Sequence, residues 1–111
     1  MNIQIYGKKK CFDTKKAERY FKERGVSFQQ IDLPKYGMSK GELKSVLQSV
    51  KSLDALLDEK GKDTPLIRYL AREEDQIEKL LEKPENLKTP IVRNGKQATV
   101  GFCPEIWKDW K

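Results

Sequence analysis

The chain has 111 residues, a length that suits one domain, and its apolar runs are far shorter than the roughly 20 residues that a membrane-spanning helix needs. Its formal net charge is +6, but charges of both signs alternate along the chain without interleaved aromatic residues, so nucleic-acid binding is not expected. With no histidine and only two cysteines, ordinary zinc sites and histidine-dependent hydrolases are excluded, which leaves cysteine or carboxylate chemistry.

The N-terminal third predicts a βαβ unit. Residues 3–7 alternate between apolar and polar, as in a short strand, and three lysines then lead to Cys11. A helix is expected to begin just after Cys11 and to end at Gly25. Residues 26–33 predict a second strand, which Pro34 should end. The two strands should be parallel and joined by a right-handed crossover.

The middle of the chain, from about residue 38 to 84, has the apolar spacing of helices. Ser39 followed by Glu42 forms a capping box at the start of the first helix. A short helix is expected to begin at Thr64, and another over residues 73–81. This stretch is therefore predicted to be a helical insertion between two halves of one domain.

The C-terminal part predicts a β-hairpin and a closing helix. Residues 89–93 and 96–100 flank an Asn-Gly pair, the strongest short signal for a hairpin turn. The last helix, from about Pro104, should pack its apolar side chains on the sheet: Ile106, Trp107 and Trp110. The order predicts an α/β, thioredoxin-like βαβ-(helical insertion)-ββα domain over residues 1–111, with a mixed four-stranded sheet flanked by helices.

Cys11 is the candidate nucleophile. A thiol reacts as its thiolate, and three features predict a lowered pKa for Cys11: the adjacent helix N-terminus, the basic run Lys8 to Lys10, and the hydroxyl of Thr14. The alternative is that Cys11 is a small apolar packing residue. Cys103, at the start of the last helix, is either a resolving thiol or a passive packed cysteine.

Several segments, taken in order over essentially the full length, resemble the arsenate-reductase-related family. That family has an N-terminal strand that ends in a cysteine loop, then a helical insertion and a proline-led hairpin. The resemblance implies a thioredoxin-like core and a cis peptide bond between Thr89 and Pro90. The matching segments are residues 5–11, 56–61, 81–84, 87–92 and 100–101.

The chain departs from two functional patterns of this family. Family arsenate reductases hold the oxyanion with arginines, and the corresponding places here are near Lys60, at Thr89 and at Phe102-Cys103. Because lysine lacks the guanidinium fork, arsenate reduction is not expected. The Spx regulators of the family usually carry a CxxC redox switch, whereas residues 11–14 read CxxT.

These residues are closer to a glutaredoxin layout. We interpret the chain as a thiol-dependent oxidoreductase with Cys11 as nucleophile and Thr14 supporting its thiolate, with no bound cofactor, and with glutathione or another thiol as reductant of a small thiol or disulfide substrate. Residues expected to bind the substrate or thiol are Lys8, Lys10, Lys60, Thr89, Pro90 and Gly101.

The alternative interpretation is an Spx-like, non-enzymatic regulatory module that binds a protein partner such as RNA polymerase. In either case the absence of a signal-peptide pattern predicts a cytoplasmic protein without a membrane segment. A monomer without a metal is expected.

Overall fold

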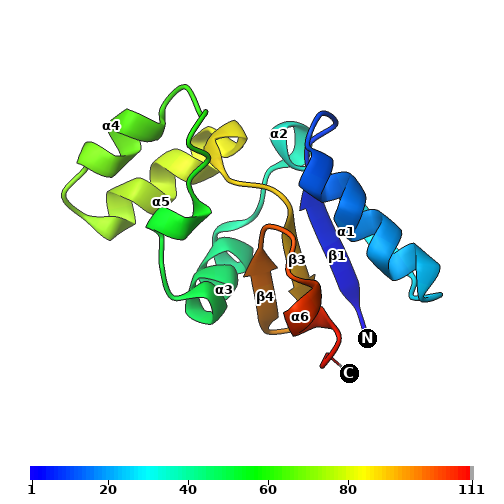
Figure 1. The fold of residues 1–111 in the computed structure, drawn as a ribbon. Helices are drawn as coiled ribbons and strands as arrows, with labels where there is room; N and C mark the ends of the chain where they lie inside the picture. Colours follow the sequence, from blue (N-terminus) through cyan, green and yellow to red (C-terminus); the bar gives the residue numbers. More distant parts are fainter. Residues whose placement is uncertain (111) are drawn as a thin grey trace.

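A computed structural model describes residues 1–110 as a mixed four-stranded sheet with helices on both faces (Figure 1). The strand order is β2-β1-β3-β4, in which β1 pairs parallel with β2 and antiparallel with β3, and β3 and β4 form an antiparallel hairpin. The strands are β1 (Ile3–Gly7), β2 (Phe28–Asp32), β3 (Ile91–Asn94) and β4 (Gln97–Val100). The predicted fold class is confirmed.

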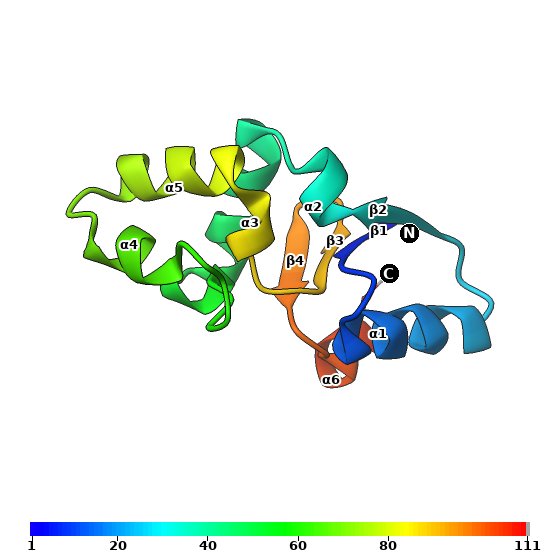
Figure 2. The same ribbon diagram turned by 90° about the horizontal axis from the view of Figure 1, so that it is seen from above.

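The helices divide between the two faces of this sheet. Viewed from above, α1 and α6 lie on one face, α3 lies on the other, and α4 and α5 extend away from the end of the sheet (Figure 2). None of the helices within residues 1–110 is long and apolar enough to cross a membrane. The helices are α1 (Phe12–Glu23), α2 (Leu33–Tyr36), α3 (Lys40–Val50), α4 (Thr64–Tyr69), α5 (Glu73–Glu82) and α6 (Pro104–Trp107), with 3₁₀ turns η1 (Asp54–Leu56) and η2 (Pro84–Asn86).

The period of two in β1 sends side chains into two separate cores. Ile3 and Ile5 point toward α1 and α6, where an aromatic cluster covers the sheet. Tyr6 points to the opposite face, into the larger core that the helical insertion builds. The aromatic cluster comprises Tyr20, Phe21, Trp107 and Trp110 together with Ala17, Val92, Ile3 and Ile5.

The capping box predicted at the start of α3 is confirmed. The Ser39 hydroxyl accepts the Glu42 N–H at 3.1 Å, and the Glu42 carboxylate accepts the Ser39 N–H at 2.8 Å. The other carboxylate oxygen of Glu42 accepts a 2.8 Å hydrogen bond from the Tyr6 hydroxyl. This side chain therefore both starts α3 and ties it to the centre of the sheet.

Two local expectations were wrong. The second strand is limited to Phe28–Asp32, and Leu33–Tyr36 forms α2, because Pro34 in the first helical turn needs no N–H partner and can begin a helix there. The last helix is only one turn long. Its Ile106 remains 45 % exposed and does not pack on the sheet, whereas Trp107 and Trp110 are buried as predicted.

Candidate functional site

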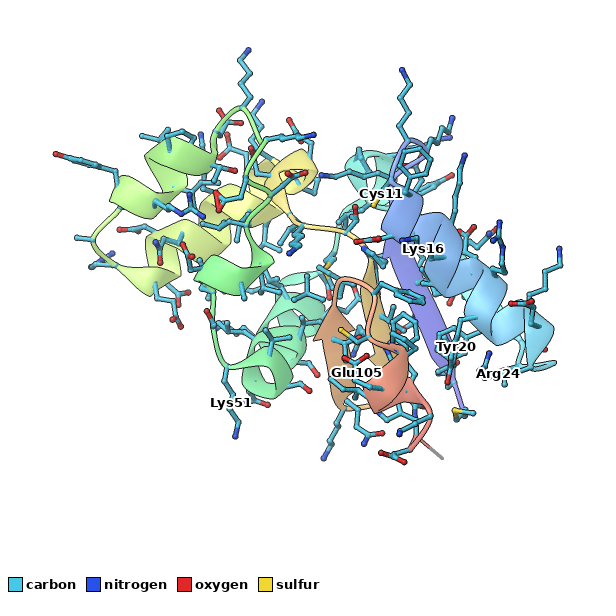
Figure 3. All side chains as sticks on the ribbon, viewed as in Figure 1. Cys11, Lys16, Tyr20, Arg24, Lys51 and Glu105 are labelled. Atoms are coloured by element: carbon cyan, nitrogen blue, oxygen red, sulfur yellow. The ribbon has the colours of Figure 1, made fainter. Side chains whose placement is uncertain are left out.

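Cys11 is the residue that precedes the first turn of α1, directly above the end of β1 (Figure 3). Its backbone is extended, with φ −92° and ψ 115°, and its N–H donates to the Lys8 carbonyl at 3.2 Å, which closes the loop between strand and helix. At this position the unpaired N–H groups of the first helical turn and the positive end of the helix dipole lie beside the thiol.

Hydrogen bonds favour the thiolate form of Cys11. Partial burial raises the pKa of this thiol, but hydrogen bonds from the side chains of Thr14 and Thr89 and from the backbone N–H groups of Thr14 and Asp13 outweigh burial and hold the pKa below its ordinary value. The lowered pKa agrees with the prediction. Its main favourable causes are the helix start and Thr14, joined by Thr89, and not the lysine run.

Thr14 packs closely against Gly7 at the end of β1 and against Lys8 in the cysteine loop. Thr14 is buried, and its hydroxyl oxygen accepts the Lys8 N–H at 3.4 Å, which leaves the hydroxyl proton available for the Cys11 sulfur. A Cβ at Gly7 would collide with the Thr14 side chain. Glycine at this position therefore permits the close approach of β1 and α1 on which the thiol's environment depends.

The Lys8 side chain contacts the helical insertion. Its ammonium donates to the Asp58 carboxylate at 2.7 Å and to the Glu85 carbonyl at 2.9 Å. Burial raises the pKa of Asp58, but the hydrogen bond from Lys8 and that from the Lys60 N–H hold it below its usual range. Lys8 thus links the cysteine loop to the helical insertion. Its predicted role in binding substrate stays a prediction.

The other two predicted lysines, Lys10 and Lys60, have exposed side chains. Lys60 donates its backbone N–H to a carboxylate oxygen of Asp58 at 2.9 Å, and the predicted roles of Lys10 and Lys60 in binding substrate stay predictions. Asp58 was missed by the sequence-based prediction because nothing in the local pattern shows that a carboxylate 50 positions away accepts a hydrogen bond from the Lys8 ammonium.

The hairpin supplies the opposite wall of the site. The Cys11 thiol donates to the Thr89 carbonyl at 3.5 Å, and the following peptide bond to Pro90 is cis, as the resemblance implied. Gly101, with φ +86°, donates its N–H to the Pro90 carbonyl at 2.8 Å. The structure therefore places Thr89 against Cys11 and joins Gly101 to the neighbouring Pro90, and the binding of a thiol or substrate by these three residues stays a prediction.

Cys103 is the second free cysteine, half-buried at the start of α6. Its thiol donates to the Val100 carbonyl at 3.4 Å. Burial and the Glu105 carboxylate raise the pKa of Cys103, in contrast with Cys11. Its predicted role as a resolving thiol is untested by this geometry. Within residues 1–110, no group of three or more histidine, cysteine, aspartate or glutamate side chains is arranged to hold a metal.

Known proteins resemble this chain over its whole length. The Global transcriptional regulator Spx 2 of Oceanobacillus iheyensis is 28 % identical, with 100 % of this chain and 94 % of that protein aligned. The crystal structure of an ArsC family related protein from Bacteroides fragilis superposes with a TM-score of 0.85 at 20 % identity, covering 100 % of both chains. The arsenate reductase from Vibrio cholerae superposes with a TM-score of 0.82 at 22 % identity, covering 96 % of this chain and 94 % of that one.

At such identities the two structural matches establish the fold, which is thioredoxin-like, and leave the activity open. The family model is more specific because it matches residues 6–110, from the end of the first strand through the cysteine loop, the insertion and the hairpin to the last helix. The chain belongs to the ArsC family.

Proposed function

We propose that this protein is a thiol-dependent oxidoreductase with Cys11 as its nucleophile. The observation that carries the proposal is the hydrogen-bonded thiol at the start of α1, whose pKa is held below the ordinary value by Thr14, Thr89 and the first helical N–H groups. A thiol with a lowered pKa has a larger thiolate fraction at neutral pH, and the thiolate is the form that attacks a disulfide.

In the first step the Cys11 thiolate attacks one sulfur of a substrate disulfide, a Cys11–substrate disulfide forms, and the other substrate sulfur leaves as a thiolate that takes up a proton. In the second step a thiolate of glutathione, or of another small thiol, attacks the substrate sulfur of this mixed disulfide and releases Cys11 as the thiolate. The net change is reduction of one disulfide and formation of another, with no bound cofactor.

The residues around Cys11 have distinct parts in this proposal. Thr14 stabilises the thiolate at the start and at the end of the cycle, when Cys11 is the leaving group. Thr89, Pro90 and Gly101 form the wall against which the substrate or thiol lies, and the exposed Lys10 and Lys60 attract the carboxylates of glutathione. Cys103 is a second route for resolution, by attack on the Cys11 sulfur. The proposal includes a monomer acting in the cytoplasm.

The test is turnover of a neutral small disulfide, bis(2-hydroxyethyl) disulfide, in excess glutathione. A second glutathione thiolate attacks the glutathione sulfur of the mixed disulfide that Cys11 releases, the 2-hydroxyethyl thiolate leaves and takes up a proton, and the glutathione disulfide that forms is measured by its coupled reduction. Cys11→Ser should abolish turnover. Cys103→Ser is the matched control because it removes the other free thiol. It keeps turnover if glutathione resolves the mixed disulfide, and lowers turnover if Cys103 does. Unchanged turnover in Cys11→Ser contradicts the proposal.

A second candidate function, a regulatory module that holds RNA polymerase, is favoured by the full-length similarity to a transcriptional regulator. The helical insertion also presents large exposed side chains on α4, with Tyr69 90 % and Leu66 52 % exposed. This function predicts binding of purified RNA polymerase that survives Cys11→Ser and is lost in Tyr69→Ala. Absence of binding at low salt counts against it.

A further inference from the structure

A row of cationic and aromatic side chains runs along α1, the helix that begins just after Cys11. Figure 3 shows Cys11, Lys16, Tyr20 and Arg24 following one another along this helix. Lys16, Tyr20 and Arg24 are spaced four residues apart, so they lie on one face of α1 and of the turn that ends it. The proposed chemistry at Cys11 makes no use of this row.

The row borders a hollow of about 180 Å³ between α1 and the loop that follows β4. Three of the side chains that line it are cationic and one is a carboxylate; the lining residues are Lys16, Arg19, Tyr20, Glu23, Arg24 and Phe102. A hollow of this composition attracts anionic groups and offers aromatic surface for the apolar part of the same ligand.

Aromatic rings hold two of the three cations in place. The Arg24 guanidinium lies 3.7 Å from the centre of the Tyr20 ring and donates to the Tyr20 carbonyl at 3.2 Å. The Lys16 ammonium lies 5.8 Å from the centre of the Phe102 ring. Both rings pack edge-on against the buried Trp107. Cations that are already oriented lose less conformational entropy when a ligand binds.

Carboxylates on the same helix only partly neutralise this row. Lys16 lies 3.9 Å from Asp13, but both side chains are about half exposed, and such pairs contribute little. Glu23 lines the hollow beside Arg19 and Arg24. The local excess of positive charge therefore remains available to a ligand.

We propose that this face of α1 docks an acidic segment of a protein disulfide that Cys11 reduces. The inference rests on the proposed function and adds its substrate class. From Cys11 to Arg24 the helix rises about 20 Å, at roughly 1.5 Å per residue, and an extended peptide covers that length with about six residues. The acidic residues of the substrate should therefore lie within about six positions of its reactive cysteine.

The test uses synthetic peptides in which a single cysteine carries a 2-thiopyridyl group through a disulfide. The Cys11 thiolate attacks the peptide sulfur, a Cys11–peptide disulfide forms, and 2-thiopyridone leaves and is followed by absorbance. One peptide carries four glutamates two to five positions from the cysteine, a second carries four glutamines there, and a third carries the glutamates ten to thirteen positions away. The protein carries Cys103→Ser so that one thiol reacts.

We expect the near-glutamate peptide to react about tenfold faster than the glutamine peptide at low salt, and most of this advantage to disappear near 0.5 M salt. The far-glutamate peptide should behave like the glutamine peptide. The double variant Lys16→Gln, Arg19→Gln should lose the preference. The control double variant Lys51→Gln, Lys96→Gln removes the same charge from exposed positions on the end of α3 and the hairpin turn and should keep it.

Equal rates for the near-glutamate and glutamine peptides overturn the docking surface, as does an equal loss of preference in both double variants. Neutral 2,2′-dithiodipyridine separates this result from a failure of the proposed function. If Cys11 reacts with that reagent without preferring acidic peptides, only the docking surface is wrong. If Cys11 reacts with none of these disulfides, the proposed function itself is wrong.

Discussion

The Lys8 ammonium lies 2.7 Å from the Asp58 carboxylate and joins the loop that carries Cys11 to the helical insertion, 50 positions further along the chain. Both side chains are largely covered, with 20 % and 29 % of their surface exposed. The same ammonium also binds the Glu85 carbonyl at the far end of the insertion. The insertion therefore helps to fix the loop on which the proposed nucleophile sits.

Asp58→Asn should lower the free energy of unfolding by about 1 kcal/mol at pH 7, because it leaves the Lys8 ammonium partly buried without its counter-ion. The pKa of Asp58 is depressed in the folded protein, so the stabilisation is present above the unfolded pKa of about 3.9 and is lost as pH falls through the folded value. The measurement is urea unfolding at pH 7 and at pH 3.

The matched control for this pair is Lys60→Gln, because Lys60 reaches Asp58 through its backbone and keeps that hydrogen bond when the side chain changes. It should alter stability far less than Asp58→Asn. A double-mutant cycle with Lys8→Met isolates the pair. A coupling energy near zero would show that the contact contributes nothing.

The pKa of Cys11 should lie below that of an ordinary thiol, and the pKa of Cys103 should lie above it. In Cys103→Ser, the rate of Cys11 alkylation should rise with pH about a midpoint below that of a free cysteine, since hydrogen bonds stabilise the thiolate. In Cys11→Ser, the midpoint for Cys103 should lie above it, since burial and Glu105 disfavour the thiolate. Coincident midpoints would mean that the two sites do not differ electrostatically.

Thr14 can be tested with two substitutions of similar size. Thr14→Val removes the hydroxyl while keeping the shape of this buried side chain, so the alkylation midpoint of Cys11 should rise and the reaction at pH 7 should slow several-fold. Thr14→Ser keeps the hydroxyl and should retain most of the lowered pKa. If both variants alkylate like the parent, the Thr89 side chain and the backbone N–H groups lower the pKa of the thiol without the Thr14 hydroxyl.

Short-range patterns predicted the parts of the fold that depend on neighbouring residues. The capping box at Ser39 and the strand before Cys11 each follow from residues a few positions apart, and each is present. The predicted hairpin is also present, but its two turn residues are Gly95 and Lys96, because Asn94 belongs to β3 and pairs with Gln97. Pro34 shows the limit of such patterns. It is equally suited to ending a strand and to opening a helical turn, and the sequence alone favoured the first.

Contacts of the site between residues close in sequence could be predicted, whereas contacts between distant segments could not. Thr14 lies one helical turn from Cys11, so its hydrogen bond could be expected. The lysine run could be read only as nearby charge, since the direction of the Lys8 side chain depends on where the insertion packs. The hydrogen bond from the Thr89 side chain likewise requires the hairpin to be placed against α1.

Asn86 should be among the most sensitive residues of the insertion. It is fully buried; its amide nitrogen donates to Asp63 and to the Lys83 carbonyl, each at 3.0 Å, and its amide oxygen accepts the Asp63 N–H at 2.9 Å. Asn86→Ala leaves these groups without partners and should lower the free energy of unfolding by about 2 kcal/mol. Asn2→Ala, which truncates an exposed asparagine, is the control and should change it by less than about 0.5 kcal/mol.

The same variant tests how firmly the insertion holds the cysteine loop. Asn86 adjoins Glu85, whose carbonyl binds the Lys8 ammonium. Loosening this turn should therefore weaken the contact between Lys8 and Glu85. Hydrogen exchange should then speed up at the N–H of Cys11, which donates to the Lys8 carbonyl, as well as around Asn86. Faster exchange confined to the turn around Asn86 would mean that the cysteine loop keeps its place without the contact between Lys8 and the Glu85 carbonyl.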